Sequence, residues 1–167
     1  MNAGRVVVAC VGNIFLGDDG FGVEVARHLA QQELPPGVEL IDVGIRGVHL
    51  AYELLDGCDL LVLVDAAARG EPPGTVSVIE AGPAGDSAGL PVIDAHGLAP
   101  DDVFALLERL GSRPARTLVV ACEPADLAPG LELSAPVHAA VPHAVQAVHD
   151  ILRREVAAPS NRKEWSG

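Results

Sequence analysis

The sequence predicts a single α/β domain in three layers, in which helices flank both faces of a twisted, mostly parallel five-stranded sheet. Short aliphatic runs alternate along the chain with stretches of helical periodicity, which is the pattern of repeated strand and helix units. Hydrophobic residues make up 49% of the 167 residues and aromatic residues only 3%, so the core must be built from aliphatic side chains. This length fits one domain, which we place at residues 1–154.

Five aliphatic runs are the predicted strands. Runs without polar alternation suit strands that are buried on both faces of a parallel sheet, where right-handed crossovers are nearly obligatory. The fourth run alternates branched apolar residues with others, as an additional strand would. The five runs are Arg5–Val11, Val38–Val43, Leu60–Val64, Thr75–Ile79 and Thr117–Ala121.

Helices are predicted where apolar residues recur at helical spacing between capping and stop signals. The first begins near Phe21 and stops before Pro35, a short one covers about 48–55, and another starts near Pro100. The last follows Ser134, a residue type favoured at the N-cap. Its apolar face is marked by Val137, Val141, Val145, Val148 and Leu152. Residues 155–167 lack periodicity, and we expect a disordered tail there.

Composition excludes several classes of partner. A formal net charge of −12 argues against nucleic acid and anionic membrane surfaces, because phosphate contacts require a basic face. No apolar run is long enough to span a membrane, and the first residues lack a secretory signal, so we expect a cytoplasmic protein. The three cysteines, Cys10, Cys58 and Cys122, lie inside apolar runs and are interpreted as reduced core residues.

Three polar residues fall at places where an α/β sheet binds ligands. Asp19 follows the first strand, Asp65 ends the third, and His96 precedes the helix that starts near Pro100. The carboxyl ends of neighbouring strands lie side by side, so these residues can converge, and two carboxylates with an imidazole suit a divalent transition metal. Taken singly, Asp65 could cap a turn and His96 could be a loop histidine. Asp18 and Asp19 could be helix N-terminal acids, which we expect to be the whole role of Asp18.

Other known site patterns are absent from the sequence. The glycines between 12 and 22 do not form a dinucleotide fingerprint, and no nucleophile elbow, zinc-protease helix or C-x-x-C pair occurs. His138, His143 and His149 are spread around the last helix and are interpreted as surface or packing residues.

An ordered set of motifs resembles the NiFe-hydrogenase maturation endopeptidases over about the first 150 residues. The opening motif is GNIFLGDDGFG at 12–22. The ordered set of motifs is specific, whereas any one piece of it would not be. The other segments are LVLVDA at 61–66, HGL at 96–98, CEP at 122–124, LS at 133–134 and AVPHAV at 140–145.

The resemblance implies an endopeptidase, classed in that family as aspartic-type, that removes the C-terminal extension of a hydrogenase large-subunit precursor after nickel insertion. It implies that Asp19, Asp65 and His96 form the metal-contacting site. Our own hypothesis adds Asp19 and Asp65 as the candidate catalytic residues. The nickel is carried by the precursor, and cadmium or zinc could take its place in a crystal. Many relatives have glutamate where this chain has Asp19.

Precursor recognition is expected after the second strand, at Asp42, Gly44 and Arg46. Here the chain reads GIRG at 44–47, where the family more often has Gly-Gly-Thr. The predicted partner is the large-subunit precursor, and the enzyme is expected to be a monomer or weak dimer.

The sequence leaves two questions open. Either carboxylate, or a metal-polarised water, could make or assist the attack on the scissile carbonyl, because no serine or cysteine nucleophile with a base is evident. The alternative function is a nickel-dependent chaperone that binds the precursor without cutting it.

Overall fold

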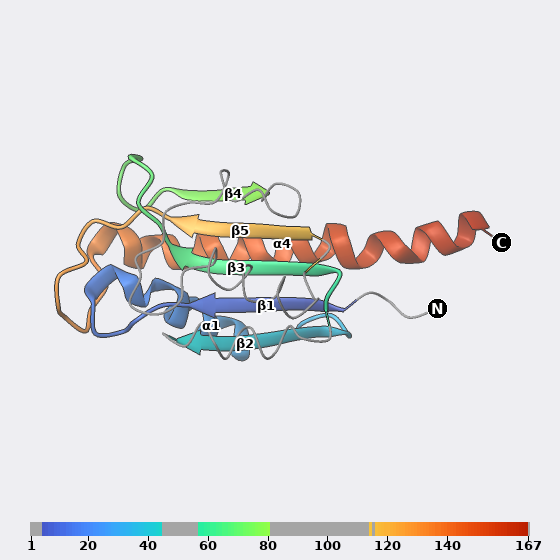
Figure 1. Cartoon of the computed structure of the whole chain (residues 1–167), viewed down its shortest axis with the longest axis horizontal. Helices are drawn as coiled ribbons and strands as arrows, with labels where there is room; N and C mark the ends of the chain where they lie inside the picture. The colour runs from blue at the N-terminus through green and yellow to red at the C-terminus, as the bar shows by residue number, and fades with distance from the viewer. Residues whose placement is uncertain (1–4, 45–56, 81–113, 115, 167) are drawn as a thin grey trace.

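The computed structural model describes residues 5–44, 57–80, 114 and 116–166, and within them a five-stranded sheet forms the centre of the molecule. The strands lie in the order β2-β1-β3-β5-β4 (Figure 1). All pairs are parallel except β4 with β5, which is antiparallel at the edge of the sheet. The strands are β1 (Val6–Val11), β2 (Val38–Gly44), β3 (Leu60–Ala66), β4 (Val76–Glu80) and β5 (Arg116–Cys122).

The five predicted strands are confirmed, and none of their ends lies more than two residues from the predicted position. β3 and β5 are buried along almost their whole length, as expected for central strands without polar alternation. β4 is only half-buried, which fits its alternating sequence and its place at the edge.

Two helices, α1 (Phe21–Ala30) and α4 (Ala135–Ser166), pack on one face of the sheet. Their apolar side chains join those of alternate strand positions, such as Val8, Val62 and Val120, in one core cluster. The whole predicted apolar face of α4 is buried in this cluster, whereas His138 and His143 are exposed. Burying one apolar stripe of each helix against the sheet is what fixes their orientation.

The opposite face of the sheet is also buried. Val7, Leu61 and Val119 are fully buried in a second cluster on that side. The helices that we predicted at 48–55 and from Pro100 lie outside the described residues. The fold is therefore a single α/β domain with a mostly parallel sheet, as predicted.

The last helix extends further than predicted. Its backbone continues to Ser166, where we predicted a disordered tail over residues 155–167. The good helix formers Arg153, Arg154 and Glu155 directly after Leu152 favour continuation of the helix, whereas nothing in the structure explains its passage through Pro159. The domain boundary at 154 stays a prediction. Among the described helices, none has both the length and the apolar character needed to cross a lipid bilayer.

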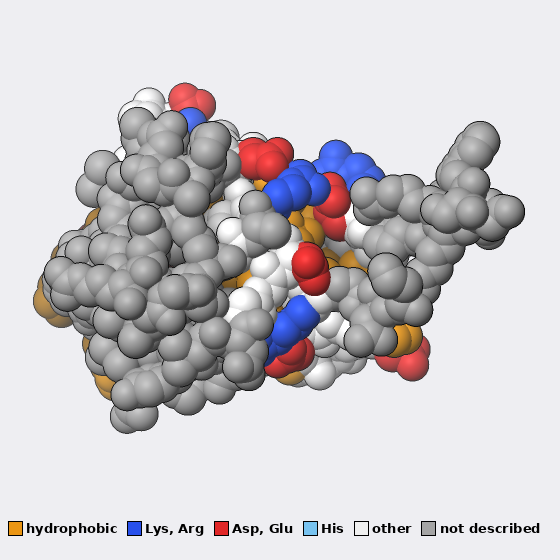
Figure 2. Space-filling view, turned by 45° about the vertical axis from the view of Figure 1, so that its right-hand side comes forward, with side chains coloured by type: hydrophobic (Ala, Val, Ile, Leu, Met, Phe, Trp, Pro, Cys, Tyr) orange, Lys and Arg blue, Asp and Glu red, His pale blue; other side chains and the backbone are white. Residues whose placement is uncertain are grey.

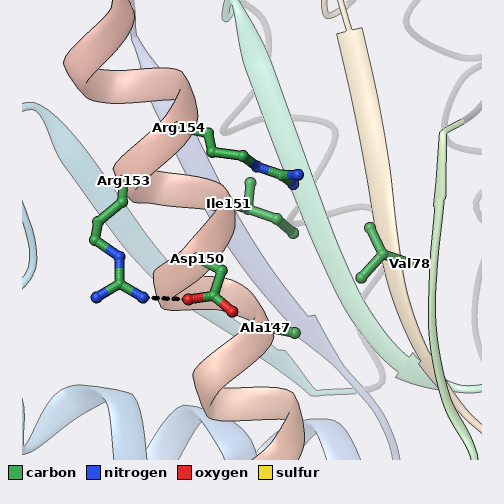
Figure 3. Close-up of a pocket in the computed structure, with 6 residues that line it drawn as sticks. All are labelled: Val78, Ala147, Asp150, Ile151, Arg153 and Arg154. Carbon is green, nitrogen blue, oxygen red and sulfur yellow. Dashed lines mark hydrogen bonds and ion pairs between the residues drawn. The ribbon is translucent and has the colours of Figure 1, made fainter.

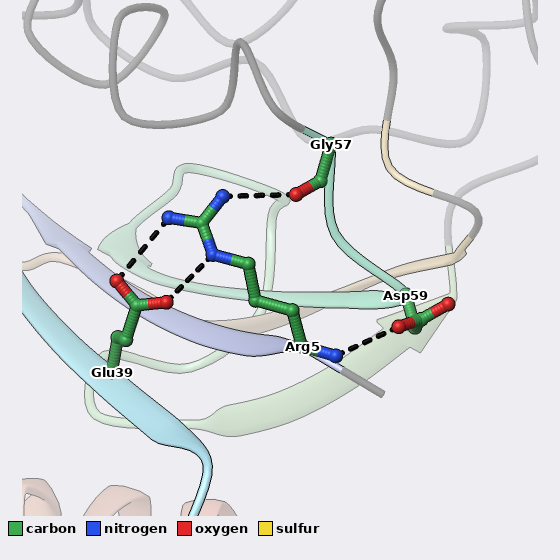
Figure 4. A network of polar contacts seen from close by, with 4 residues as sticks. All are labelled: Arg5, Glu39, Gly57 and Asp59. Carbon is green, nitrogen blue, oxygen red and sulfur yellow. Dashed lines mark hydrogen bonds and ion pairs between the residues drawn. The ribbon is translucent and has the colours of Figure 1, made fainter. Parts of the chain in front are cut away.

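Charged residues form hydrogen bonds and ion pairs between strands at one end of the sheet, the edge where the parallel strands begin. Arg5 donates to both carboxylate oxygens of Glu39 on β2, and to the main-chain oxygen of Gly57 before β3 (Figure 4). Arg116 at the start of β5 pairs with Glu80 on β4 and Glu155 on α4. Figure 2 shows this side of the molecule, where basic and acidic side chains are intermixed.

Candidate active site

The predicted site residues that the structure describes lie at the opposite edge, where β1, β2 and β3 end. Cys10 on β1 lies opposite Asp42 on β2 and opposite Val64 on β3, so Asp42 and Asp65 flank the end of β1. The chain then leaves β1 and forms a one-turn 3-10 helix, η1 (Gly17–Gly20), which packs against β3. Asp19 of η1 is thereby brought to the strand ends that carry the other two acids.

Asp19 is held by the turn that follows β1. Its side chain is 4% exposed, and its Oδ2 accepts a hydrogen bond from the main-chain N–H of Asn13 at 3.0 Å. The same N–H approaches the main-chain oxygen of Asp19 at 3.1 Å, and the N–H of Asp19 donates to Leu16. The carboxylate therefore has a fixed position, which a catalytic or ligating group requires.

Two glycines in the opening motif allow η1 and α1 to approach the strand ends closely. A Cβ atom on Gly12 would lie 2.2 Å from the main-chain oxygen of Asp19. A Cβ atom on Gly22 would lie 2.2 Å from the oxygen of Val11 and 2.8 Å from that of Val64. Only glycine fits these two positions, because any side chain would push the start of α1 away from β1 and β3.

Asp65 is the last residue but one of the central strand β3. Its side chain is 1% exposed, and its Oδ1 accepts a hydrogen bond from the N–H of Ala66 at 2.7 Å. A carboxylate at such a depth costs stability unless other groups compensate its charge. Its strand lies between β1 and β5, and a site shared by Asp65 and Asp19 stays a prediction.

Negative charge is concentrated at this edge. The buried acids of the described residues are Asp18, Asp19, Asp65 and Glu123, and all four follow or end a strand here. Burial raises the pKa of the Cys10 thiol, and the carboxylates of Asp42 and Asp65 raise it further. An edge with this charge favours a cationic ligand.

The role of Asp18 differs from our prediction. It was expected to act only as a helix N-terminal acid, yet it connects two loops. Its Oδ2 accepts hydrogen bonds from the N–H groups of Ala125 (2.7 Å) and Asp126 (2.8 Å) and from the Ser134 hydroxyl (2.8 Å). Its Oδ1 accepts one from the N–H of Ser134 at 2.6 Å. Burial acts to raise the pKa of Asp18, but these hydrogen bonds outweigh it and lower the pKa below its ordinary value.

Ser134 and Glu123 are two supporting residues whose contacts the sequence did not reveal. Ser134 does precede α4, and its main-chain oxygen accepts a hydrogen bond from the N–H of His138. Its hydroxyl, however, donates a hydrogen bond to the carboxylate of Asp18. The Oε1 of Glu123 accepts the N–H groups of Arg69 (2.8 Å) and Glu71 (3.2 Å), which fixes the loop after β3. The only signal for both was their place in the family motifs.

The three cysteines do not supply a nucleophile. Cys10 and Cys122 are fully buried and Cys58 is half-buried. Burial raises the pKa of Cys122 to about 12, with additional effects of Asp18 and Glu123. Burial also raises the pKa of Cys58 to about 11. Burial of Cys10 and Cys122 confirms their interpretation as core residues, and Cys58 packs half-buried against the second cluster.

The remaining predicted site residues are placed only in part. Asp42 is exposed near the end of β2, and Gly44 is its last residue, just after an irregularity in the pairing with β1. Arg46 and His96 lie outside the described residues. The described residues alone contain no group of three histidine, cysteine or acidic residues that could hold a metal. The ligand set of Asp19, Asp65 and His96 therefore stays a prediction.

A pocket of about 650 Å³ lies elsewhere, between β4 and α4 (Figure 3). Its lining includes Val78 and Ile151, and Arg153 pairs with Asp150 at its side. None of the predicted site residues lines it. The pocket is thus separate from the edge that carries the buried acids.

Comparison with known proteins identifies the family. The model of the family described as "Hydrogenase maturation protease" matches residues 23–151. The hydrogenase expression/formation protein HupD of Rhizobium leguminosarum bv. viciae is 32% identical over 97% of this chain and 81% of its own length. The corresponding protein HoxM of Cupriavidus necator is 32% identical over 94% of this chain and 78% of its own length.

Solved structures agree with the sequence comparison. The hydrogenase maturating endopeptidase HybD from E. coli has a TM-score of 0.77 and 30% identity, covering 90% of this chain and 93% of that one. A solution structure of an E. coli endopeptidase has a TM-score of 0.74 and 28% identity, with coverage of 90% and 93%. This chain, with its buried acids at the carboxyl edge of the sheet, belongs to the hydrogenase maturation protease family and is a hydrolase of the endopeptidase class.

Proposed function

We propose that this enzyme removes the C-terminal extension of a NiFe-hydrogenase large-subunit precursor, and that it does so after recognising nickel already bound by the precursor. The observation that carries the proposal is the pair of buried acids, Asp19 and Asp65, at the strand ends of a hydrogenase maturation protease fold. Family membership supports processing of the large subunit, and the charge of this edge supports recognition of a cationic centre.

The donor set fits a nickel ion that arrives with the substrate. Carboxylates supply negative charge, and the predicted third ligand, His96, would supply an imidazole, which suits nickel. The ion, when bound, gives the enzyme a positive charge to recognise and fixes the position of the nearby peptide bond. Asp19 and Asp65 bind on the enzyme side, and their main-chain hydrogen bonds keep them in position.

Peptide hydrolysis then needs a group that accepts a proton from the attacking water. Asp19 or Asp65 takes this proton while the water oxygen bonds to the scissile carbonyl carbon, and a proton returns to the amine as the C–N bond breaks. Burial raises the pKa of all three cysteine thiols, and the Ser134 hydroxyl donates to Asp18, so neither kind of group is placed to act as a nucleophile with a base. Cadmium or zinc could bind the same ligands in place of nickel.

The experiment is to mix the purified protein with nickel-loaded precursor and to follow loss of the extension by mass spectrometry. Nickel-free precursor is the control and should stay intact. Asp19→Asn, Asp65→Asn and His96→Ala are each expected to reduce processing at least about a hundredfold while circular dichroism remains unchanged. Full processing by all three variants would refute the proposal. A precursor that binds tightly but keeps its mass would instead identify a chaperone.

A further inference from the structure

Three exposed apolar side chains lie close to the buried acids. We call Ile14, Phe15 and Leu131 the apolar rim; they are 45%, 63% and 74% exposed. Among the described residues, one other large apolar side chain, Val78, has comparable exposure, and it lies on β4 beside the separate pocket. A chain with so few aromatic residues leaves one of its phenylalanines in solvent at this place.

The apolar rim belongs to two segments that the backbone joins. The N–H of Gly130 donates to the oxygen of Phe15 at 2.9 Å, and the N–H of Gly17 donates to the oxygen of Gly130 at 2.9 Å. Leu16 and Gly130 form a parallel bridge between these hydrogen bonds. Phe15 and Leu131 are therefore held near each other although they are far apart in sequence.

One of these segments also fixes the position of the Asp19 carboxylate. Asn13 donates its N–H to Asp19, and its side-chain oxygen accepts the N–H of Phe15 at 2.9 Å. One residue thus fixes both a candidate catalytic carboxylate and the apolar rim. The Asp19 carboxylate and Phe15 of the rim are therefore attached to the same turn after β1.

The size of the apolar rim decides between possible occupants. Three side chains provide on the order of 300 Å², whereas a stable interface between two proteins buries roughly 800 Å² on each partner. The rim alone is too small to hold a second copy of this chain. It suits a few apolar side chains of a segment whose main attachment is elsewhere, such as a metal-bearing centre at the acids.

We propose that the apolar rim binds apolar side chains of the precursor that flank the scissile peptide bond. This inference rests on the proposed function and adds a determinant of substrate choice to it. The acids would recognise the charged centre of the precursor, and the rim would recognise the polypeptide next to it. A few well-buried side chains usually carry most of the binding energy of an interface, so a rim of three residues can affect substrate affinity.

The test compares the double variant Phe15→Ser/Leu131→Ser with the control Val78→Ser, which removes another exposed apolar side chain, 46% exposed, away from the site. With nickel-loaded precursor, the double variant is expected to raise KM at least about tenfold and to leave kcat within about twofold. The control should match the wild type. Leu131→Ser alone, at the most exposed position, should raise KM in the same direction.

A second readout does not depend on cleavage. In an Asp65→Asn background, fluorescence anisotropy of labelled, nickel-loaded precursor should show at least about tenfold weaker binding when the rim is also changed. Unchanged affinity and unchanged KM would overturn the inference. A rim variant that alters only sedimentation of the enzyme would also overturn it, because the rim would then serve self-association. Failure of the wild type to cleave would refute the proposed function, while the binding measurement would still decide the role of the rim.

Discussion

Replacing Asp18 with asparagine tests whether one buried carboxylate holds the site loops together. Asp18 is fully buried, and its oxygens accept four hydrogen bonds from the segment between β5 and α4. Asparagine keeps one acceptor oxygen, loses the charge, and turns an NH₂ group toward main-chain donors. Hydrogen bonds to charged groups are worth about 1.5–3 kcal/mol each, and a buried unsatisfied donor costs about 1–3 kcal/mol. We therefore expect the free energy of unfolding at pH 7 to fall by about 2–4 kcal/mol.

The effect should depend on pH in a defined direction. Because folding lowers the pKa of Asp18, ionisation of this group stabilises the folded state at pH values above the pKa of an unfolded aspartate, about 4. This stabilisation is lost as the pH falls through the lower pKa of the folded state. The difference between wild type and Asp18→Asn is thus complete at pH 7 and shrinks below about pH 4.

Urea unfolding followed by circular dichroism at pH 7 and at lower pH measures this difference. The control is Asp126→Asn in the same loop, an exposed aspartate whose Oδ1 accepts only a local hydrogen bond from Ala128. It should change the free energy of unfolding by less than about 0.5 kcal/mol. In thermal unfolding, Asp18→Asn should lower Tm by about 4–16 °C. Equal stability of Asp18→Asn and wild type at pH 7, or a difference that grows on acidification, would refute the reasoning.

Two further predictions concern the approach of α1 and the opposite edge of the sheet. Gly22→Ala places a Cβ against the oxygens of Val11 and Val64, so it should cost about 1–3 kcal/mol of stability and slow precursor processing. Val23→Ala is the control in urea unfolding, and a stable, fully active Gly22→Ala would contradict the packing argument. Arg116→Ala removes ion pairs with the partly exposed Glu80 and Glu155, so it should cost only about 0.5–1.5 kcal/mol, less in 1 M salt, with normal processing. A loss of activity at unchanged stability would show that this edge takes part in the reaction.

The strands and the two described helices could be predicted because each is specified locally. Aliphatic runs such as Leu60–Val64 leave few alternatives to a buried strand, and the apolar positions of α4 repeat at helical spacing. The direction of β4 could not be predicted in this way, because strand pairing depends on contacts with β5 that are distant in sequence.

The positions of Asp19 and Asp65, an acid after β1 and an acid at the end of β3, could be predicted from the sequence, and their role in a site stays a prediction. The role of Asp18 was not, because its partners Ala125, Asp126 and Ser134 lie more than a hundred residues away. No local pattern marks an acid that accepts hydrogen bonds from a distant loop. Arg46 and His96 stay predictions, since they lie outside the described residues.

The clamps formed by Arg5 and Arg116 have a consequence for how the enzyme could diversify. They join neighbouring strands and the long C-terminal helix at the end of the molecule remote from the acids. The two ends of the strands therefore carry different kinds of contact, with partly exposed ion pairs at one end and buried carboxylates that accept hydrogen bonds at the other. Exchange of a loop at the acid end would leave the contacts of Arg5 and Arg116 in place, because both residues lie where the strands begin.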